Sequence, residues 1–373
     1  MIPVSEPSLH DEELENIIDC VKTNWISSSG KYITEFEKEF AAFHKTKHAI
    51  ALSNGTAALE VALYASGIRK GDEVIVPSFT IISVALAVLR IGAIPRFVDV
   101  DCDTWNIDPD LVEDLINEKT RAIIGVHSFG HPFNAERILK IVSKHKLILI
   151  EDTAESMASK YKGSLCGTFG DVATFSLYAN KLITTGEGGI IITNSDEIAN
   201  KARRYINLYF GHNERFSHDQ LGFNFRMTNM QAAIGLAQMK RVEKHIERKK
   251  TIGAWYKEEI KGSKYFQFQQ SVGEIDHVYW MYSFLMNDEV NLESGEMISL
   301  LKDKGIESRQ LFKGLHLQRP LKKYLFEGQC NFIQTEKLYR KGFYLPSSIN
   351  LTRNDVKNIV CAINEIAECH KKK

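Results

Sequence analysis

The sequence predicts an α/β protein, with a large domain built on a mostly parallel seven-stranded sheet and a smaller C-terminal α+β domain. Between about residues 45 and 194, seven short apolar runs alternate with helical patterns, as is typical of strands joined by crossover helices. At 373 residues the chain also exceeds the size at which a single hydrophobic core usually keeps growing. We therefore expect a large domain at residues 1–245 and a small one at residues 246–373.

The predicted elements follow one another in a regular order. The seven expected strands span His48–Leu52, Glu73–Pro77, Ile94–Val98, Arg121–Val126, Leu147–Ile150, Val172–Ser176 and Ile190–Thr193. Apolar residues at helical spacing from Met230 to Glu247 then predict one long helix that leaves the large domain. The small domain is predicted to contain a strand at Val278–Leu285, a helix at Gly295–Lys304 and a closing helix at Arg353–Cys369.

Charge and cysteine content argue against several classes of protein. Basic and acidic residues both total 47, so no basic excess points to nucleic acid or to an anionic membrane. The six cysteines form no CxxC pair and no His/Cys cluster, which argues against a structural metal site and a disulfide framework. The N-terminus lacks a signal-peptide pattern, and no run approaches the ~18 to 20 apolar residues of a membrane span. We expect a cytoplasmic protein with no metal and with small-molecule ligands.

Familiar hydrolase and dehydrogenase motifs are also missing. The histidines form no HExxH pair, and no glycine-flanked serine elbow accompanies an evident His/Asp pair. Gly-x-Gly-x-x-Gly does not follow the first predicted strand, so a dinucleotide-binding dehydrogenase is a weak alternative.

One lysine stands out because of the residues that accompany it. Lys181 follows the predicted strand that ends at Ser176 and precedes a glycine-rich turn, although a single lysine is usually only a surface charge. Asp152 ends a strand predicted to be buried, at the edge of the sheet where ligands bind in open α/β folds. Asp152 could instead cap a following helix. Glu155 could face the same ligand or simply lie in the first turn of that helix.

A candidate anion site precedes these residues in the chain. At Gly55 and Thr56 a strand end passes through a polar turn into a helix, so backbone N–H groups and a hydroxyl point to one spot. Ser176 would face the same edge and could donate to a phosphate, or merely pack. A phosphate cradle, an acidic partner for a ring nitrogen and a lysine for a Schiff base are what pyridoxal phosphate (PLP) needs from a protein.

Longer motifs give the chain a family resemblance. These are Trp25–Tyr32, Ser53–Ala57, Val76–Thr80, Glu151–Asp152, Ser176–Lys181 and Gly222–Gly235. With them the chain resembles the nucleotide-sugar aminotransferases of the fold-type I PLP enzymes, most closely the perosamine synthase-like branch. The resemblance implies a Schiff base at Lys181, a pairing of Asp152 with the pyridine nitrogen and a place for Glu155 near the ring oxygen.

The resemblance also implies the remaining contacts. The phosphate would be held by Gly55, Thr56, Ala57 and Ser176, joined by Asn224 from the second subunit of a homodimer whose active sites lie at the subunit interface. The nucleotide-linked sugar would be bound by Trp25, Ser27, Ser28, Gly30, Arg309 and His316. Trp25 could instead be a buried anchor, and Arg309 a surface charge.

The implied reaction is the transfer of the amino group of L-glutamate to a nucleotide-linked 4-keto-6-deoxy sugar. Its product would be a 4-amino-4,6-dideoxy sugar for glycan or O-antigen biosynthesis. The alternatives are a 3-keto sugar, a UDP or dTDP sugar in place of a GDP sugar, and a catalytically silent regulatory relative. Related dehydratases carry histidine where this chain has Lys181, which favours transamination. Many relatives place an aromatic residue where this chain has Ile81, so ring stacking would fall to Ile81 or Phe79.

Overall fold

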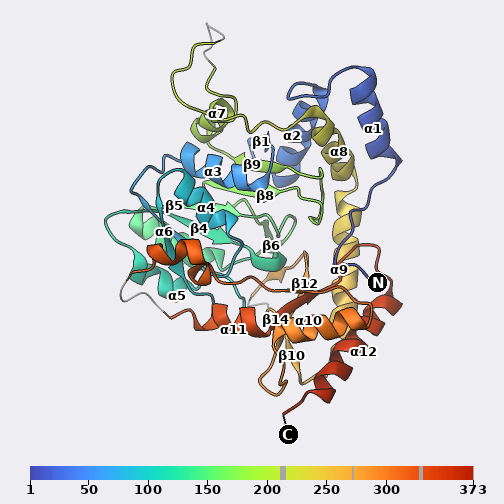
Figure 1. Cartoon of the computed structure of the whole chain (residues 1–373). Coiled ribbons are helices and arrows are strands. Elements are labelled where there is room, and N and C mark those ends of the chain that lie inside the picture. Colours follow the sequence, from blue (N-terminus) through green and yellow to red (C-terminus); the bar gives the residue numbers. More distant parts are fainter. Residues whose placement is uncertain (211–215, 271–272, 327–330, 373) are drawn as a thin grey trace.

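A seven-stranded sheet forms the centre of the larger part of the molecule (Figure 1). The computed structural model describes residues 1–210, 216–270, 273–326 and 331–372. The strands of this sheet, in spatial order, are β1 (His48–Leu52), β9 (Gly189–Thr193), β8 (Val172–Ser176), β5 (Ile148–Asp152), β4 (Thr120–Val126), β2 (Glu73–Pro77) and β3 (Ile94–Val98). β9 runs antiparallel to both of its neighbours, β1 and β8, and the other neighbouring strands are parallel. The predicted mostly parallel seven-stranded sheet is confirmed.

Helices cover both faces of this sheet, which explains why its strands are almost continuously apolar. Ile50 and Ile124 lie on the face covered by α3 (Gly55–Ala65), α4 (Ser83–Arg90) and α7 (Asp196–Tyr205). Their chain neighbours Ala49 and Ile123 point to the other face, because side chains alternate along a strand. That face is covered by α2 (Lys31–His44), α8 (Asn229–Lys240) and α6 (Ala135–His145).

The C-terminal part packs several helices against a small antiparallel sheet. Its strand order is β10 (Phe266–Gln267), β12 (Tyr282–Met286), β14 (Gly342–Leu345) and β13 (Arg309–Gln310). The helices of this part are α9 (Val242–Glu259), α10 (Ser294–Asp303), α11 (Ile333–Lys341) and α12 (Arg353–Cys369). α12 has the predicted bounds because Thr352 and Asp355 form a capping box at its start. The predicted domain boundary at 245/246 falls inside α9 and stays a prediction.

Shorter elements complete the described chain. They are α1 (Asp11–Lys22), α5 (Pro109–Val112), the 3-10 turns Glu113–Leu115, Ser128–Gly130, Leu315–Leu317 and Arg319–Tyr324, and the strands β6 (Lys160–Tyr161), β7 (Ser164–Leu165) and β11 (Ile275–Asp276). Since β11 pairs with β6, a C-terminal segment is hydrogen-bonded directly to the larger part.

Several predicted elements differ from the structure by one or two residues at an end, but two differ by more. The expected long helix from Met230 to Glu247 is two helices, because Arg241 leaves the helical conformation between α8 and α9 while its guanidinium bonds to Glu13. The strand expected from Val278 begins only at Tyr282, since Tyr279 has a positive φ of 53° that no extended strand accommodates. In both places a local backbone change interrupts an apolar pattern that is otherwise continuous.

The connection from β8 to β9 bears directly on the site. Because these strands are antiparallel, they are joined by the loop 177–188 without a crossover helix. The loop is closed at its base by the hydrogen bond from Leu177 N–H to the Gly188 carbonyl at 2.9 Å, and Thr185 N–H also donates to the Leu177 carbonyl. Lys181 lies within this loop.

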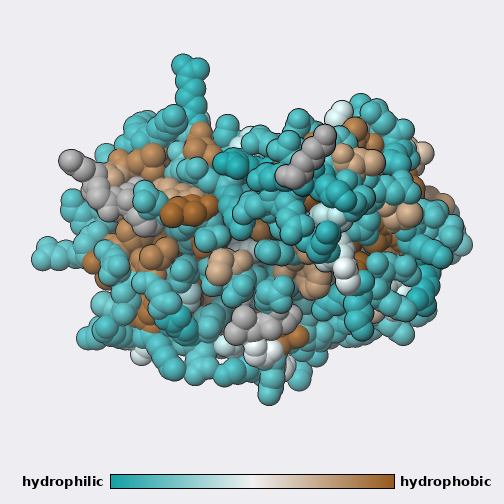
Figure 2. Space-filling view, turned by 90° about the horizontal axis from the view of Figure 1, so that it is seen from below, coloured by the Kyte–Doolittle hydropathy of each residue, from teal (hydrophilic) through white to brown (hydrophobic). Residues whose placement is uncertain are grey.

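The surface of the C-terminal part is mainly polar. Figure 2 views the molecule from that end, where hydrophilic residues cover most of the face and hydrophobic residues show in patches between them. Among the residues that the structure describes, no helix is both long and apolar enough to cross a lipid bilayer.

Candidate active site

A cavity of about 630 Å³ opens at the carboxyl-terminal edge of the parallel strands. Its wall is formed by the turns that follow β1, β2, β5 and β8, and by three aromatic residues from the C-terminal part, Trp280, Phe312 and Tyr344. The edge of the sheet that the sequence predicted as the ligand site is therefore hollow, and both parts of the molecule enclose it.

Lys181 lines this cavity, and its side chain is only 12% exposed. Its amine lies 3.8 Å from Oε1 of Glu155 and 3.7 Å from the centroid of the Trp280 ring. Burial lowers the pKa of Lys181 below its usual value, and the nearby carboxylates of Glu155 and Asp152 oppose this effect only in part. A larger fraction of this amine is therefore neutral, and thus nucleophilic, than at a surface lysine.

Asp152 ends β5 and its side chain also reaches the cavity. Its carboxylate accepts one hydrogen bond from the backbone N–H of Ala154 at 3.1 Å. No helix begins in residues 153–159, so the alternative role of a helix cap is wrong. Burial raises the pKa of Asp152, while that hydrogen bond and the charge of Lys181 act in the other direction. A buried carboxylate with so few donors is suited to a cationic ligand group.

The carboxylate of Glu155 lies between Lys181 and the backbone of the 3-10 turn at Ser128–Gly130. Its Oε2 accepts a hydrogen bond from the backbone N–H of Phe129 at 2.7 Å, which leaves Oε1 facing Lys181. Burial raises the pKa of Glu155 to about 7, and the charge of Lys181 lowers it in part. The lysine and the glutamate therefore titrate as a pair, so the protonation state of each depends on that of the other.

The predicted anion cradle forms at the start of α3. Asn54 caps this helix by accepting a hydrogen bond from Ala57 N–H at 2.8 Å, so the predicted phosphate donor Ala57 already has a partner. Gly55 and Thr56 line the cavity beside Ser176. A Cβ at Gly55 would lie 3.0 Å from the Cβ of Ser176, so any larger residue would require the helix end or β8 to shift by a few tenths of an ångström. The hydroxyl of Thr56 donates to Ser83 at 2.9 Å, which adds a hydroxyl that the sequence did not single out.

These groups fit PLP in the order expected. The buried amine, the carboxylate with few donors and the helix N-terminus lie around one cavity and match the aldehyde, ring nitrogen and phosphate of the cofactor. Ile81 lies on the cavity wall, whereas Phe79 is fully buried against Phe129 and Phe312. Of these two residues, Ile81 is the one placed to contact a ring.

The predicted sugar-binding residues lie outside the wall of this cavity. Trp25 is more than half exposed, which excludes the alternative of a buried anchor. Ser27 and Ser28 lie with it between α1 and α2, and Gly30 packs against Asn229. Asn224 is exposed and bonded to Arg226. Their roles stay predictions.

The two predicted sugar-binding residues of the C-terminal part, Arg309 and His316, differ in burial. Arg309 is exposed and pairs with Glu307, although it lies opposite the cavity residue Tyr344 in the β13–β14 pair. His316 is buried, and its Nδ1 lies 2.7 Å from the hydroxyl of Ser78. Burial lowers the pKa of His316. In this chain His316 braces the loop after β2.

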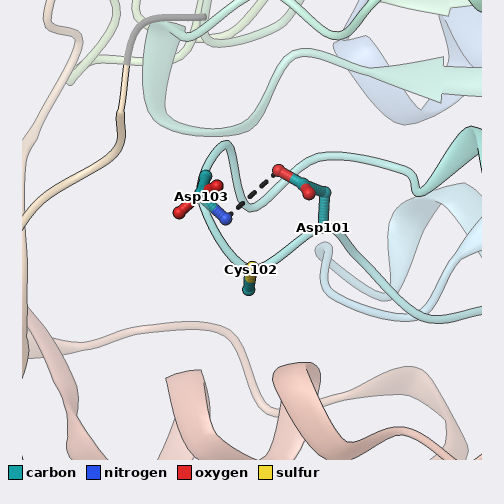
Figure 3. Close-up of side chains that lie close together, drawn as sticks. All are labelled: Asp101, Cys102 and Asp103. Carbon is teal, nitrogen blue, oxygen red and sulfur yellow. Dashed lines mark hydrogen bonds between the residues drawn. The ribbon is translucent and has the colours of Figure 1, made fainter.

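A second acidic cluster lies away from the cavity, at Asp101, Cys102 and Asp103 (Figure 3). Oδ1 of Asp101 accepts hydrogen bonds from the backbone N–H groups of Asp103 and Thr104, at 3.1 Å and 2.7 Å. It also accepts one from the Thr104 hydroxyl. This carboxylate therefore stabilises its own turn.

Comparison with known proteins identifies the family. Residues 7–364 match the model of the DegT/DnrJ/EryC1/StrS aminotransferase family. The chain belongs to this family. The GDP-perosamine synthase of Caulobacter vibrioides is 40% identical over 367 residues, which cover 98% of each chain. The enzyme of the same name from Escherichia coli O157:H7 is 41% identical over 364 residues, again 98% of each chain. The solved PLP form of Spr1654 from Streptococcus pneumoniae superposes with a TM-score of 0.93 at 25% identity over the full length of both chains.

The protein is accordingly a PLP-dependent sugar aminotransferase similar to the GDP-perosamine synthases. The fold-type I architecture expected from the resemblance is confirmed. Sequence reasoning missed the aromatic wall of Trp280, Phe312 and Tyr344. Trp280 belongs to the predicted strand Val278–Leu285, but in the structure it precedes β12 and its ring contacts Lys181.

Proposed function

We propose that the protein transfers the amino group of L-glutamate to carbon 4 of a GDP-linked 4-keto-6-deoxy sugar, and so produces a 4-amino-4,6-dideoxy sugar and 2-oxoglutarate. The observation that carries the proposal is the single cavity in which Lys181, Asp152 and Glu155 face the start of α3. Identities of about 40% to GDP-perosamine synthases support the choice of sugar and nucleotide.

Lys181, Asp152 and Glu155 would each have a distinct role in this reaction. PLP, when bound, supplies an aldehyde that joins to amines and a ring that takes up an electron pair. Lys181 would hold the cofactor covalently and, once the donor amine displaces it, remove and return the proton at the substrate carbon. Asp152 would pair with the ring nitrogen, whose positive charge is the partner that this buried carboxylate otherwise lacks. Glu155 is placed to take a proton from Lys181 or return it.

We also propose that the active form is a homodimer in which Asn224 of each subunit completes the other subunit's phosphate site. Asn224 is exposed and lies outside the cavity wall of its own chain. Within the described chain, the cavity wall has no cationic side chain other than Lys181, so a phosphate there would gain from additional donors. An exposed apolar stripe of Leu14, Ile18 and Val21 on α1 gives a further surface for association.

The test combines absorbance with product analysis. The purified protein should be yellow, lose this colour when glutamate is added, and aminate a GDP-4-keto-6-deoxy sugar in preference to UDP and dTDP analogues, as read by mass. Lys181→Ala should lack turnover, and cofactor bound to it should keep its colour when glutamate is added, whereas Lys140→Ala, at an exposed lysine paired with Glu136, should behave as wild type. Transfer at the wild-type rate by Lys181→Ala would refute the assignment. Transfer to a 3-keto sugar but not to its 4-keto counterpart would identify a 3-aminotransferase instead, and the absence of colour would identify a silent relative.

A further inference from the structure

A buried lysine, Lys249, lies on α9 next to the active site. Lys249 is 4% exposed, and its amine donates hydrogen bonds to the backbone carbonyls of Trp280, at 2.8 Å, and Ser347. In the part of the chain that the structure describes, no ion pair to Lys249 is formed. Burial lowers its pKa to about 7. Placing an amine there without a counter-ion is costly, and an apolar side chain would fill the same space at a lower cost. The two hydrogen bonds are therefore what this lysine contributes.

Trp280 links this lysine to the catalytic one. The amine of Lys181 lies over the face of its indole ring at 3.7 Å, the geometry of a cation–π contact. Its indole N–H donates to the carbonyl of Asn180, the residue that precedes Lys181, at 2.9 Å. Trp280 is thus fixed at both ends, through its own carbonyl by Lys249 and through its indole N–H by the lysine loop.

Lys181 and Lys249 also share a small cavity of about 20 Å³, on whose wall Asn180 and Ser347 lie as well. It has room for about one water molecule. Lys181 therefore lies in the walls of both the active-site cavity and this smaller one. Lys249, on α9, forms part of the wall of the smaller cavity.

We propose that Lys249 and Trp280 are positioning residues, which hold the amine of Lys181 at one place in the active-site cavity. The indole ring restricts the flexible lysine side chain, and Lys249 keeps the ring in place by binding its backbone. The inference rests on the proposed role of Lys181 as the group that holds the cofactor. A reacting group displaced by about 1 Å loses on the order of a hundredfold in rate, so a loosened Trp280 should slow the reaction without weakening substrate binding.

The first experiment uses the protein without cofactor, so it does not depend on which substrate is correct. Lys181 is labelled briefly with acetic anhydride, and its acetylation is measured by peptide mass spectrometry in wild type, Trp280→Leu and Lys249→Met. Both variants should label several-fold faster at Lys181, because the covering ring is absent or displaced. Lys250→Met is the matched control, since Lys250 is the next residue on α9 and pairs with Asp276 at the surface; it should label as wild type.

The second experiment measures the rate at which glutamate discharges the colour in a single turnover. Lys249→Met and Trp280→Leu should each slow this step by about tenfold or more with little change in the glutamate concentration for half-saturation. If Lys249 acts through Trp280, adding Lys249→Met to Trp280→Leu should cause no further loss. The proposal would be overturned if the rate losses of Lys249→Met and Trp280→Leu multiplied in the double variant. It would also be overturned if Lys249→Met alone showed wild-type labelling of Lys181 and a wild-type rate.

Conservative variants cover the case in which Lys249→Met does not fold. Lys249→Gln keeps N–H groups for the two carbonyls and should retain most of the rate. Trp280→Phe keeps an aromatic face and should lie closer to wild type than Trp280→Leu. Equal rates in Trp280→Phe and Trp280→Leu would show that the ring only fills space, and would refute the positioning role.

Discussion

The short distance between Glu155 and Lys181 makes the charge of the catalytic lysine sensitive to a single substitution. Glu155→Gln removes the negative charge 3.8 Å from the lysine amine while keeping an oxygen for the N–H of Phe129. At an effective dielectric constant of about 20, unit charges at about this distance attract each other by about 4 kcal/mol. Loss of an opposite charge this close should raise the neutral fraction of Lys181 by between about tenfold and about a thousandfold.

The sign of this effect follows from the two groups involved. Above about pH 7 Glu155 is mainly ionised, since its pKa is about 7, and it stabilises the charged form of Lys181. Glu155→Gln therefore lowers the pKa of Lys181. The assay follows Lys181 acetylation against pH in the cofactor-free protein, and labelling of the variant should begin at lower pH. Glu187→Gln, at another acid of the cavity wall, is the control and should leave the profile in place. An unchanged or opposite shift in Glu155→Gln would refute the coupling.

The remaining predictions concern the cradle, the subunit interface and acid stability. Gly55→Ala should weaken PLP binding by about tenfold or more, because the new Cβ meets the end of β8 at 3.0 Å; absorbance titration measures this, and Gly295→Ala, which enters open space, should bind normally. If Asn224 acts across the dimer, Asn224→Ala and Lys181→Ala are each inactive alone, but mixed subunits should recover about a quarter of wild-type activity, and no recovery would place Asn224 in its own site. Burial lowers the pKa of His44 from 6.5 to about 4, so the folded state binds fewer protons than the unfolded state in this range and loses stability as the pH falls from about 6.5 to about 4. At about pH 5 the protonation of His44 in the unfolded state lowers the free energy of unfolding by about 2 kcal/mol relative to about pH 8. His44→Phe has no such group, so its free energy of unfolding, measured with urea, should fall less between these two pH values. An unchanged pH dependence in the variant would contradict the prediction.

The site elements found from the sequence are those in which a local pattern also fixes the position in the fold. Asp152 and Ser176 end buried strands, so their carboxyl ends meet at one edge of the sheet once those strands pair. Gly55 begins a helix directly after a strand, which brings the helix N-terminus to that edge. Lys181 follows because it is five residues beyond Ser176. In each case neighbouring residues along the chain carry the information.

The site residues that the sequence did not reveal come from distant parts of the chain and reach the site only through tertiary packing. Trp280 comes from a part of the chain about 100 residues away, and the backbone turn at Tyr279 that directs it toward Lys181 has no signal in an apolar run. Lys249 looks like one more basic residue of a charged helix, and only the packing of the C-terminal part buries it. Arg241, at the break between α8 and α9, likewise contacts a residue more than 200 positions earlier, Glu13.

Lys181 lies in a hairpin loop, so the identity of the reactive residue can change without a change in the surrounding fold. The hydrogen bond from Leu177 to Gly188 ties the two ends of the loop together, and no crossover helix depends on the path between them. A change at position 181 therefore leaves the strand pairing and the phosphate cradle intact. The same frame could exchange one reactive side chain for another without being rebuilt, so new chemistry could arise here by point substitution.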